Sequence, residues 1–197
     1  VLLVVGVAVY LVTRKKGSKK SFWTAKTMAV GAMCMALSSV LSLIKLWPMP
    51  MGGSVTPASM LPLLLFAYCY GVGPGMVLGA LYGVMQFLLD GMAWAALGAI
   101  PNLLDYPIAF GLLGLAGCFR GSKAKMTAGF VLGCFGRFMA SFLSGFIFYG
   151  QYAPEGVNPV WYSLTYNGSY MLVECIICIA LGLLVGERLA KELKKVA

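Results

Sequence analysis

The sequence contains no histidine and few charged residues. Among 197 residues there are six acidic residues, and charged residues make up only 11% of the chain. The lack of histidine excludes His-based catalytic triads and zinc-protease motifs, and no GxxxxGK[ST] loop is present to bind nucleotide phosphates. The sequence therefore predicts a protein that is not an enzyme and does not itself hydrolyse ATP.

The six cysteines do not form a convincing metal site. Cys175 and Cys178 make a CxxC pair inside the apolar stretch "ECIICIA", and the other four cysteines are scattered. A CxxC pair can bind metal or perform redox chemistry, but a single pair is weak evidence. We interpret the cysteines as small buried side chains and predict no metal and no cofactor.

Apolar residues dominate what is present. They account for 60% of the chain, against about 45–50% in ordinary soluble domains, and the mean hydropathy is +0.88. A bilayer-spanning helix needs about 20 mostly apolar residues, fewer where it is buried in a bundle. The pattern predicts an all-α membrane protein with six transmembrane helices near 24–44, 58–71, 74–90, 100–118, 127–150 and 163–186.

The chain divides into three parts on this interpretation. Residues 1–20 combine the apolar stretch "VLLVVGVAVYLVT" with a basic linker, and we expect a partial additional N-terminal helix there, or the remnant of a signal-peptide apolar region. Residues 21–190 form the six-helix membrane domain. Residues 191–197 form a basic tail.

Basic residues predict the orientation. The net charge of +9 comes from short clusters between apolar stretches, so it reflects topology and gives no reason to expect nucleic acid as a partner. Lys and Arg near span ends are retained on the cytoplasmic side. The clusters are Arg14 to Lys26, Arg120 to Lys125 and Arg188 to Lys195. A multi-pass protein of the plasma membrane, in contact with lipid and with a cytoplasmic C-terminus, is expected.

Small residues recur at helical spacing on two spans. One stripe is Ala25, Ala29, Ala32 and Ala36, and the other is Gly75, Gly79 and Gly83. Such stripes allow close helix packing in lipid. They predict packing within the chain or docking of a partner membrane protein.

Three ionisable residues fall within predicted spans. Such groups are costly in a membrane and tend to mark ligand sites or transport pathways. Asp105 lies about 8 Å below the outer surface, whereas Arg137 and Glu174 lie about 17–20 Å deep, at 1.5 Å per helical residue. We expect Arg137 and Glu174 to form an ion pair, with ligand contact as the open alternative.

Further polar residues share faces with these groups. They are Asn167 with Glu174, Ser141 with Tyr149, and Tyr82 with Gln86, each pair separated by about one or two turns. Aromatic residues near the outer ends are Trp47, Trp94, Tyr149, Trp161 and Tyr162. A carboxylate among such rings suits a flat, cationic, hydrogen-bonding ligand, although Trp47 and Trp161 are equally explained as an interfacial belt.

Several segments resemble one transporter family. They are "GSVTPASMLPLLLFAYCYGVGPG", "LYGVMQFLLD", "LLDYPIAFGLLGLAG" and "GRFMASFLSGFIFYGQYAPEGVNPVWYSLTYNGSYMLVE". From about residue 24 to 190 the chain resembles the ThiT (YuaJ) family, the thiamine-binding S components of energy-coupling factor (ECF) transporters. The resemblance implies a six-helix subunit that captures thiamine outside and works with a transmembrane coupling protein and two cytoplasmic ATPases.

The resemblance also implies roles for single residues. Asp105 would meet the ligand, Tyr149 would stack on it, and Tyr162 and Asn167 would make polar contacts, with Glu174 at the acidic residue that often closes the motif. Trp94 is the nearest candidate for a further stacking ring. The alanine stripe would dock the coupling protein. Some members have His at position 141 and Trp at position 149, so weaker stacking is expected here.

Two other functions remain open on the sequence. The chain could be an S component for another vitamin, or a proton-coupled secondary transporter of a small cationic heterocycle that uses Arg137 and Glu174.

Overall fold

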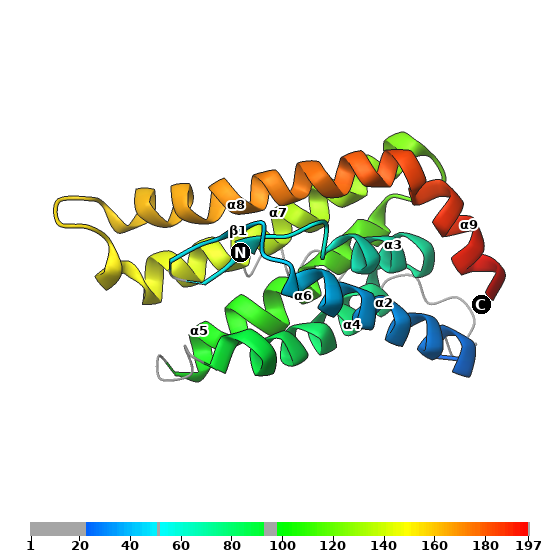
Figure 1. Ribbon diagram of the computed structural model, residues 1–197, viewed down its shortest axis with the longest axis horizontal. Coiled ribbons are helices and arrows are strands. Elements are labelled where there is room, and N and C mark those ends of the chain that lie inside the picture. Colours follow the sequence, from blue (N-terminus) through cyan, green and yellow to red (C-terminus); the bar gives the residue numbers. More distant parts are fainter. Residues whose placement is uncertain (1–22, 51, 93–97, 197) are drawn as a thin grey trace.

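The structure is a computed structural model that describes residues 23–50, 52–92 and 98–196. Within this part, long helices run roughly along one direction and form a bundle (Figure 1). The N-terminal apolar segment expected within residues 1–20 lies outside the described residues, and so does Trp94.

The helical segments coincide with the six predicted spans within a few residues, except that the last one continues past the predicted end at 186 to Val196. They are α2 (Ala25–Leu43); α3 (Leu61–Tyr70); α4 (Val72–Gln86) with η1 (Phe87–Gly91); α5 (Ala99–Leu103), η3 (Leu104–Ile108), α6 (Ala109–Leu112) and η4 (Leu113–Cys118); α7 (Lys123–Phe148) followed by η5 (Gly150–Tyr152); and α8 (Pro159–Leu181) with η6 (Gly182–Gly186) and α9 (Glu187–Val196). Five of these stretches are long and apolar enough to cross a membrane, and α3 is shorter. The predicted all-α membrane bundle is confirmed.

Short polar side chains cap the N-termini of two of the long helices. The Thr24 side chain accepts from the Thr27 amide at 3.1 Å at the start of α2. Asn158 does the same for the Val160 amide at 2.9 Å, with Pro159 at the first position of α8. These caps satisfy amides that have no partner inside the helix, so α2 and α8 begin at defined residues.

Glycines allow α4 to pack closely against its neighbours. A Cβ atom at Gly79 would lie 2.2 Å from the Phe110 carbonyl oxygen, and one at Gly75 would lie 2.5 Å from the Ala67 Cβ. Gly83 approaches the Tyr106 carbonyl in the same way. The predicted packing role of this glycine stripe is confirmed, since in lipid such contacts hold helices together.

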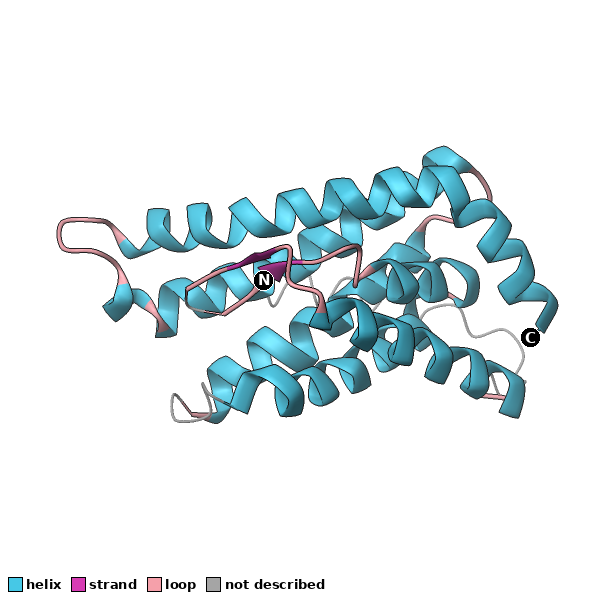
Figure 2. Cartoon of the chain, in the orientation of Figure 1, coloured by secondary structure: helices cyan, strands magenta, loops and turns pink. Residues whose placement is uncertain are grey.

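A small hairpin is the main non-helical feature of the described residues. Strands β1 (Trp47–Pro48) and β2 (Ser54–Val55) pair antiparallel, with Trp47 opposite Val55. Figure 2 shows them beside the long helices. Gly53 has a φ of +76°, and a Cβ there would lie 2.9 Å from the Tyr170 ring, so this turn packs onto α8 only because it lacks a side chain.

The two ends of the bundle differ in charge. The start of α2, the loop before α7 and helix α9 lie at one end, and the loop between α7 and α8 lies at the other (Figure 1). The first end carries Lys26, Arg120, Lys123 and the basic residues of α9. The basic clusters of the described residues are therefore brought to the same end.

Candidate ligand-binding cavity

A cavity of about 120 Å³ lies between the hairpin, α4, η3, α7 and α8. Eight of the nine residues predicted to bind a ligand line it; Trp94, the ninth, lies outside the described residues. The eight are Tyr82, Gln86, Asp105, Ser141, Tyr149, Tyr162, Asn167 and Glu174. The structure thus brings together side chains from four separate helical segments, while their contact with a ligand stays a prediction.

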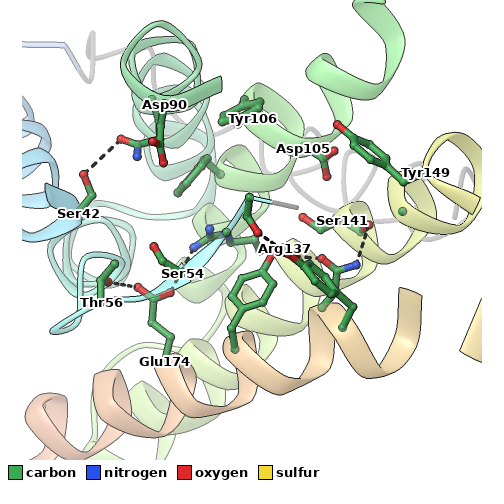
Figure 3. A pocket seen from close by; sticks show the side chains of 18 of the residues that line it. Ser42, Ser54, Thr56, Asp90, Asp105, Tyr106, Arg137, Ser141, Tyr149 and Glu174 are labelled. Carbon is green, nitrogen blue, oxygen red and sulfur yellow. Dashed lines mark hydrogen bonds and ion pairs between the residues drawn. The ribbon is translucent and has the colours of Figure 1, made fainter. Parts of the chain in front are cut away.

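Asp105 lies on a π-helical turn. The turn η3 contains Pro107, which has no N–H and so cannot complete the α-helical hydrogen-bond pattern; π turns of this kind are frequent at functional sites. The carboxylate faces α7, where Ser144 Oγ donates to Asp105 Oδ2 at 2.7 Å. In Figure 3, Asp105, Ser141 and Tyr149 gather on one side of the cavity.

Arg137 and Glu174 lie on the other side of the cavity. Arg137 Nη1 is 4.0 Å from Glu174 Oε2, and the Arg137 guanidinium also covers the Phe110 ring at 4.1 Å. The Thr56 hydroxyl donates to Glu174 Oε1 at 2.5 Å (Figure 3). The Ser59 hydroxyl donates to the same oxygen at 2.8 Å. The predicted ion pair is therefore present, and both of its members also line the cavity.

A second ion pair involves Asp90. Lys45 Nζ donates to Asp90 Oδ1 at 2.8 Å and to Oδ2 at 3.1 Å, and Asp90 lines the cavity. Both side chains are partly exposed, at 41% and 44%. This pair joins the segment after α2 to the end of η1.

These pairs leave one carboxylate in the cavity without a matching cation. Asp90 is balanced by Lys45 and Glu174 by Arg137. Within the described residues, Asp105 has no Lys or Arg nitrogen within 4.0 Å. Its carboxylate accepts hydrogen bonds from the side chains of Ser144, Ser141 and Tyr149, and the Arg137 charge acts on it only from beyond ion-pair distance. Burying an unbalanced carboxylate is unfavourable, so a ligand with one positive charge would complete the cavity.

Tyrosine rings form much of the wall. Tyr162 and Tyr166 have ring centroids 5.8 Å apart, and Tyr166 and Tyr170 follow at 6.2 Å. Tyr149 lies 6.3 Å from Tyr152. Burial, together with the nearby Asp105 charge, raises the pKa of Tyr149, so its phenol stays neutral and can donate a hydrogen bond.

The Asn167 amide is held in place by its own helix and by α7. On its own helix, its Nδ2 donates to the Ser163 carbonyl at 3.1 Å and its Oδ1 accepts from Tyr170 at 3.1 Å. Nδ2 also donates to the Ser141 carbonyl of α7 at 3.4 Å. The side chain is 7% exposed. Because both ends of the amide are engaged, its orientation in the cavity wall is defined.

Two predicted aromatic residues lie elsewhere. Trp47 and Trp161 are 68% and 64% exposed and do not line the cavity. Their position agrees with the interfacial-belt interpretation.

Sequence reasoning missed several lining residues. Tyr166 and Tyr170 follow Tyr162 at four-residue spacing, so the period of α8 could have identified them. Thr56 and Ser59 come from a turn before α3, and no sequence pattern places that turn against Glu174. Asp90 was overlooked because it ends a span where an acidic residue is unremarkable.

The alanine stripe has a different environment from the glycine stripe. Ala25, Ala29, Ala32 and Ala36 are all exposed along α2. The described chain therefore does not use this stripe for its own packing.

No group of three or more Cys, Asp or Glu side chains that could hold a metal ion occurs in the described part of the chain. Cys178 is buried and Cys175 is partly buried on α8.

A multi-pass helical bundle with a polar, tyrosine-lined cavity defines a membrane protein that accommodates a small solute. Comparison with known sequences specifies the family. The family described as "Thiamine transporter protein (Thia_YuaJ)" matches residues 28–193, and the chain belongs to it. This is a family of transporters, in agreement with the prediction that the chain is not an enzyme.

The names of individual relatives agree with this family assignment. The chain is 38% identical to thiamine transporter ThiT of Bacillus subtilis over 144 residues, which cover 66% of this chain and 73% of that protein. It is 31% identical to thiamine transporter ThiT of Lacticaseibacillus paracasei over 170 residues, covering 78% and 81%. The solved structure of ThiT from Listeria monocytogenes matches with a TM-score of 0.74 at 21% identity, over 85% of this chain and 96% of that one, which shows a shared fold.

Proposed function

We propose that this chain captures thiamine from the outer side of the plasma membrane as the substrate-binding S component of an ECF transporter. The observation that carries the proposal is the Asp105 carboxylate, which lies in a tyrosine-lined cavity with no Lys or Arg nitrogen of the described residues within 4.0 Å. Thiamine has one permanent positive charge, on its thiazolium ring, and two flat rings. It therefore matches both the charge and the walls of the cavity.

The residues that line the cavity have separate roles in this proposal. Asp105 balances the thiazolium, and Tyr149 faces it; a cation over an aromatic face gains about 0.5–2 kcal/mol. Tyr162 and Asn167 orient the ligand through hydrogen bonds. The hairpin forms part of the cavity through Gly52, Gly53 and Ser54, so its displacement would open a path to the ligand.

Uptake requires other subunits. The chain has no phosphate-binding loop, so ATP would be hydrolysed by two cytoplasmic ATPases that act through a transmembrane coupling protein. The exposed stripe of Ala25, Ala29, Ala32 and Ala36 is a surface on which a helix of that protein can approach closely. The basic clusters lie at the same end of the bundle as the C-terminal helix α9, which supports a cytoplasmic C-terminus.

Titration calorimetry of the purified chain with thiamine tests the proposal. We expect saturable binding for the wild type and at least tenfold weaker binding for Asp105→Asn, because loss of a buried charge pair removes more than 1.4 kcal/mol. Glu155→Gln is the matched control, since Glu155 is an exposed carboxylate of the outer loop. Unchanged affinity of Asp105→Asn would contradict the role of Asp105.

Two further assays separate the alternatives. Competition by other vitamins at lower concentrations than thiamine would indicate an S component of different specificity. Accumulation of thiamine in liposomes that contain this chain and no ATPase would indicate proton-coupled secondary transport.

A further inference from the structure

The Arg137 guanidinium has hydrogen-bond donors without acceptors beside the cavity. Its Nε and Nη1 atoms are buried and have no hydrogen-bond partner in the described structure. The side chain lines the cavity and is 11% exposed. Buried N–H groups without an acceptor are rare because they lose their hydration and gain nothing in return. An acceptor supplied from the cavity would remove this cost.

Glu174 provides an acceptor next to these donors. Its Oε1 already accepts from Thr56 and Ser59, whereas Oε2 faces Arg137 Nη1 at 4.0 Å. That separation exceeds the range of a direct hydrogen bond. The pair therefore neutralises its charges, while the Arg137 Nε and Nη1 donors stay without an acceptor and Oε2 takes part in no direct hydrogen bond with Arg137.

We infer that Arg137 and Glu174 together recognise the edge of a 4-aminopyrimidine ring. A ring nitrogen accepts from an Arg137 N–H group, and the exocyclic amine donates to Glu174 Oε2. Because Nε and Nη1 are buried, this contact requires the Arg137 side chain to turn toward the cavity until its planar edge faces the ring. This inference rests on the proposed function and adds to it, because it assigns the neutral ring of thiamine to one side of the cavity and the thiazolium to Asp105 on the other.

A protein donor next to a protein acceptor distinguishes one ring from another by the order of the acceptor and donor groups along the edge of the ring. Two side-chain groups that match the adjacent acceptor and donor of an aminated ring discriminate strongly against a ring with another pattern. A 4-oxopyrimidine reverses the order, so its N–H would face the guanidinium and its carbonyl would face the carboxylate. Both contacts would then be repulsive, which favours the amino form.

The matched ligands for a test are thiamine, oxythiamine and pyrithiamine. Oxythiamine has an oxo group in place of the amine, and pyrithiamine keeps the aminopyrimidine but replaces the thiazolium with a pyridinium ring. Titration calorimetry on the purified wild-type chain gives their dissociation constants. We expect oxythiamine to bind about tenfold to hundredfold more weakly than thiamine and pyrithiamine to stay within about tenfold of thiamine.

Variants then assign the discrimination to the pair. Arg137→Met combined with Glu174→Gln removes both charges and keeps an amide oxygen for Thr56 and Ser59, and Arg137→Lys is the conservative variant. Both should lower the ratio of the oxythiamine to the thiamine dissociation constant toward one. Arg120→Met is the control, because Arg120 is exposed and lies against Gly71, away from the cavity.

The possible results distinguish a failure of this inference from a failure of the proposed thiamine-binding function. Equal binding of thiamine and oxythiamine by the wild type would overturn the inference, and this result needs no variant to fold. The inference is also overturned if a folded Arg137 variant still binds thiamine and keeps the wild-type ratio of the oxythiamine to the thiamine dissociation constant. If the wild type binds no thiamine, the proposed function itself fails.

Discussion

Ser144 Oγ donates a 2.7 Å hydrogen bond to Asp105 Oδ2 and so connects α7 to the π-helical turn η3. Ser144 is fully buried, so this hydroxyl is a fixed part of the cavity wall. The bond sets the direction of the carboxylate that we propose to meet the thiazolium.

Replacing Ser144 with alanine should therefore weaken thiamine binding. A hydrogen bond to a charged group contributes about 1.5–3 kcal/mol, and part of this orients Asp105, so we expect roughly a tenfold rise in the dissociation constant. Titration calorimetry measures this dissociation constant. Ser169→Ala is the control, because Ser169 is exposed and its hydroxyl donates to the Tyr166 carbonyl of its own helix. Equal affinities of the two variants would contradict the orienting role.

Tyr149→Trp should tighten thiamine binding severalfold. Tryptophan is the best ring for a cation, and the gain is part of about 0.5–2 kcal/mol per contact. Tyr149→Ala should weaken binding by a similar factor. Trp161→Ala serves as the control because Trp161 lies outside the cavity lining. Calorimetry compares the three, and tighter binding by the alanine variant would argue against stacking at this position.

Ala32→Trp should abolish uptake while leaving thiamine binding unchanged. A bulky ring on the exposed alanine stripe would hold the coupling protein's helix away, but the stripe does not line the cavity. Uptake of labelled thiamine by the reconstituted complex and titration of the isolated chain are compared. Leu37→Trp, at another exposed position of α2, is the control. Normal uptake with Ala32→Trp would show that the stripe is not the docking surface.

Gly79→Ala should destabilise the bundle by about 1–3 kcal/mol, as expected for an overpacked helix contact. The new Cβ would lie 2.2 Å from the Phe110 carbonyl, so α4 must move away. Thermal unfolding in detergent measures the loss. Gly73→Ala on the same helix meets nothing within 4 Å and should be neutral or slightly stabilising, since alanine favours helix over glycine. A matching shift for both variants would mean that contact with Phe110 does not limit the packing.

Most of the candidate site could be predicted from the sequence because charged and amide groups are rare in apolar helices. Asp105, Asn167 and Glu174 stand out within their spans, and helical periodicity extends the prediction to residues a turn away. The partners of these groups could not be predicted in the same way. Ser144 looks like any small helix residue until the packing of α7 on η3 places it against Asp105.

The amino-acid sequence by itself determined that the chain crosses a membrane, where its helices run and which end carries the basic clusters. These properties depend on local hydropathy and charge, which each segment carries independently of the others. Only the tertiary structure decided which carboxylates are balanced. Lys45 and Asp90 are 45 positions apart, and the pairing of Arg137 with Glu174 depends on how α7 packs on α8. Electrostatic balance is a property of distances in space, so Asp105 could be recognised as the unmatched charge only after the helices were in place.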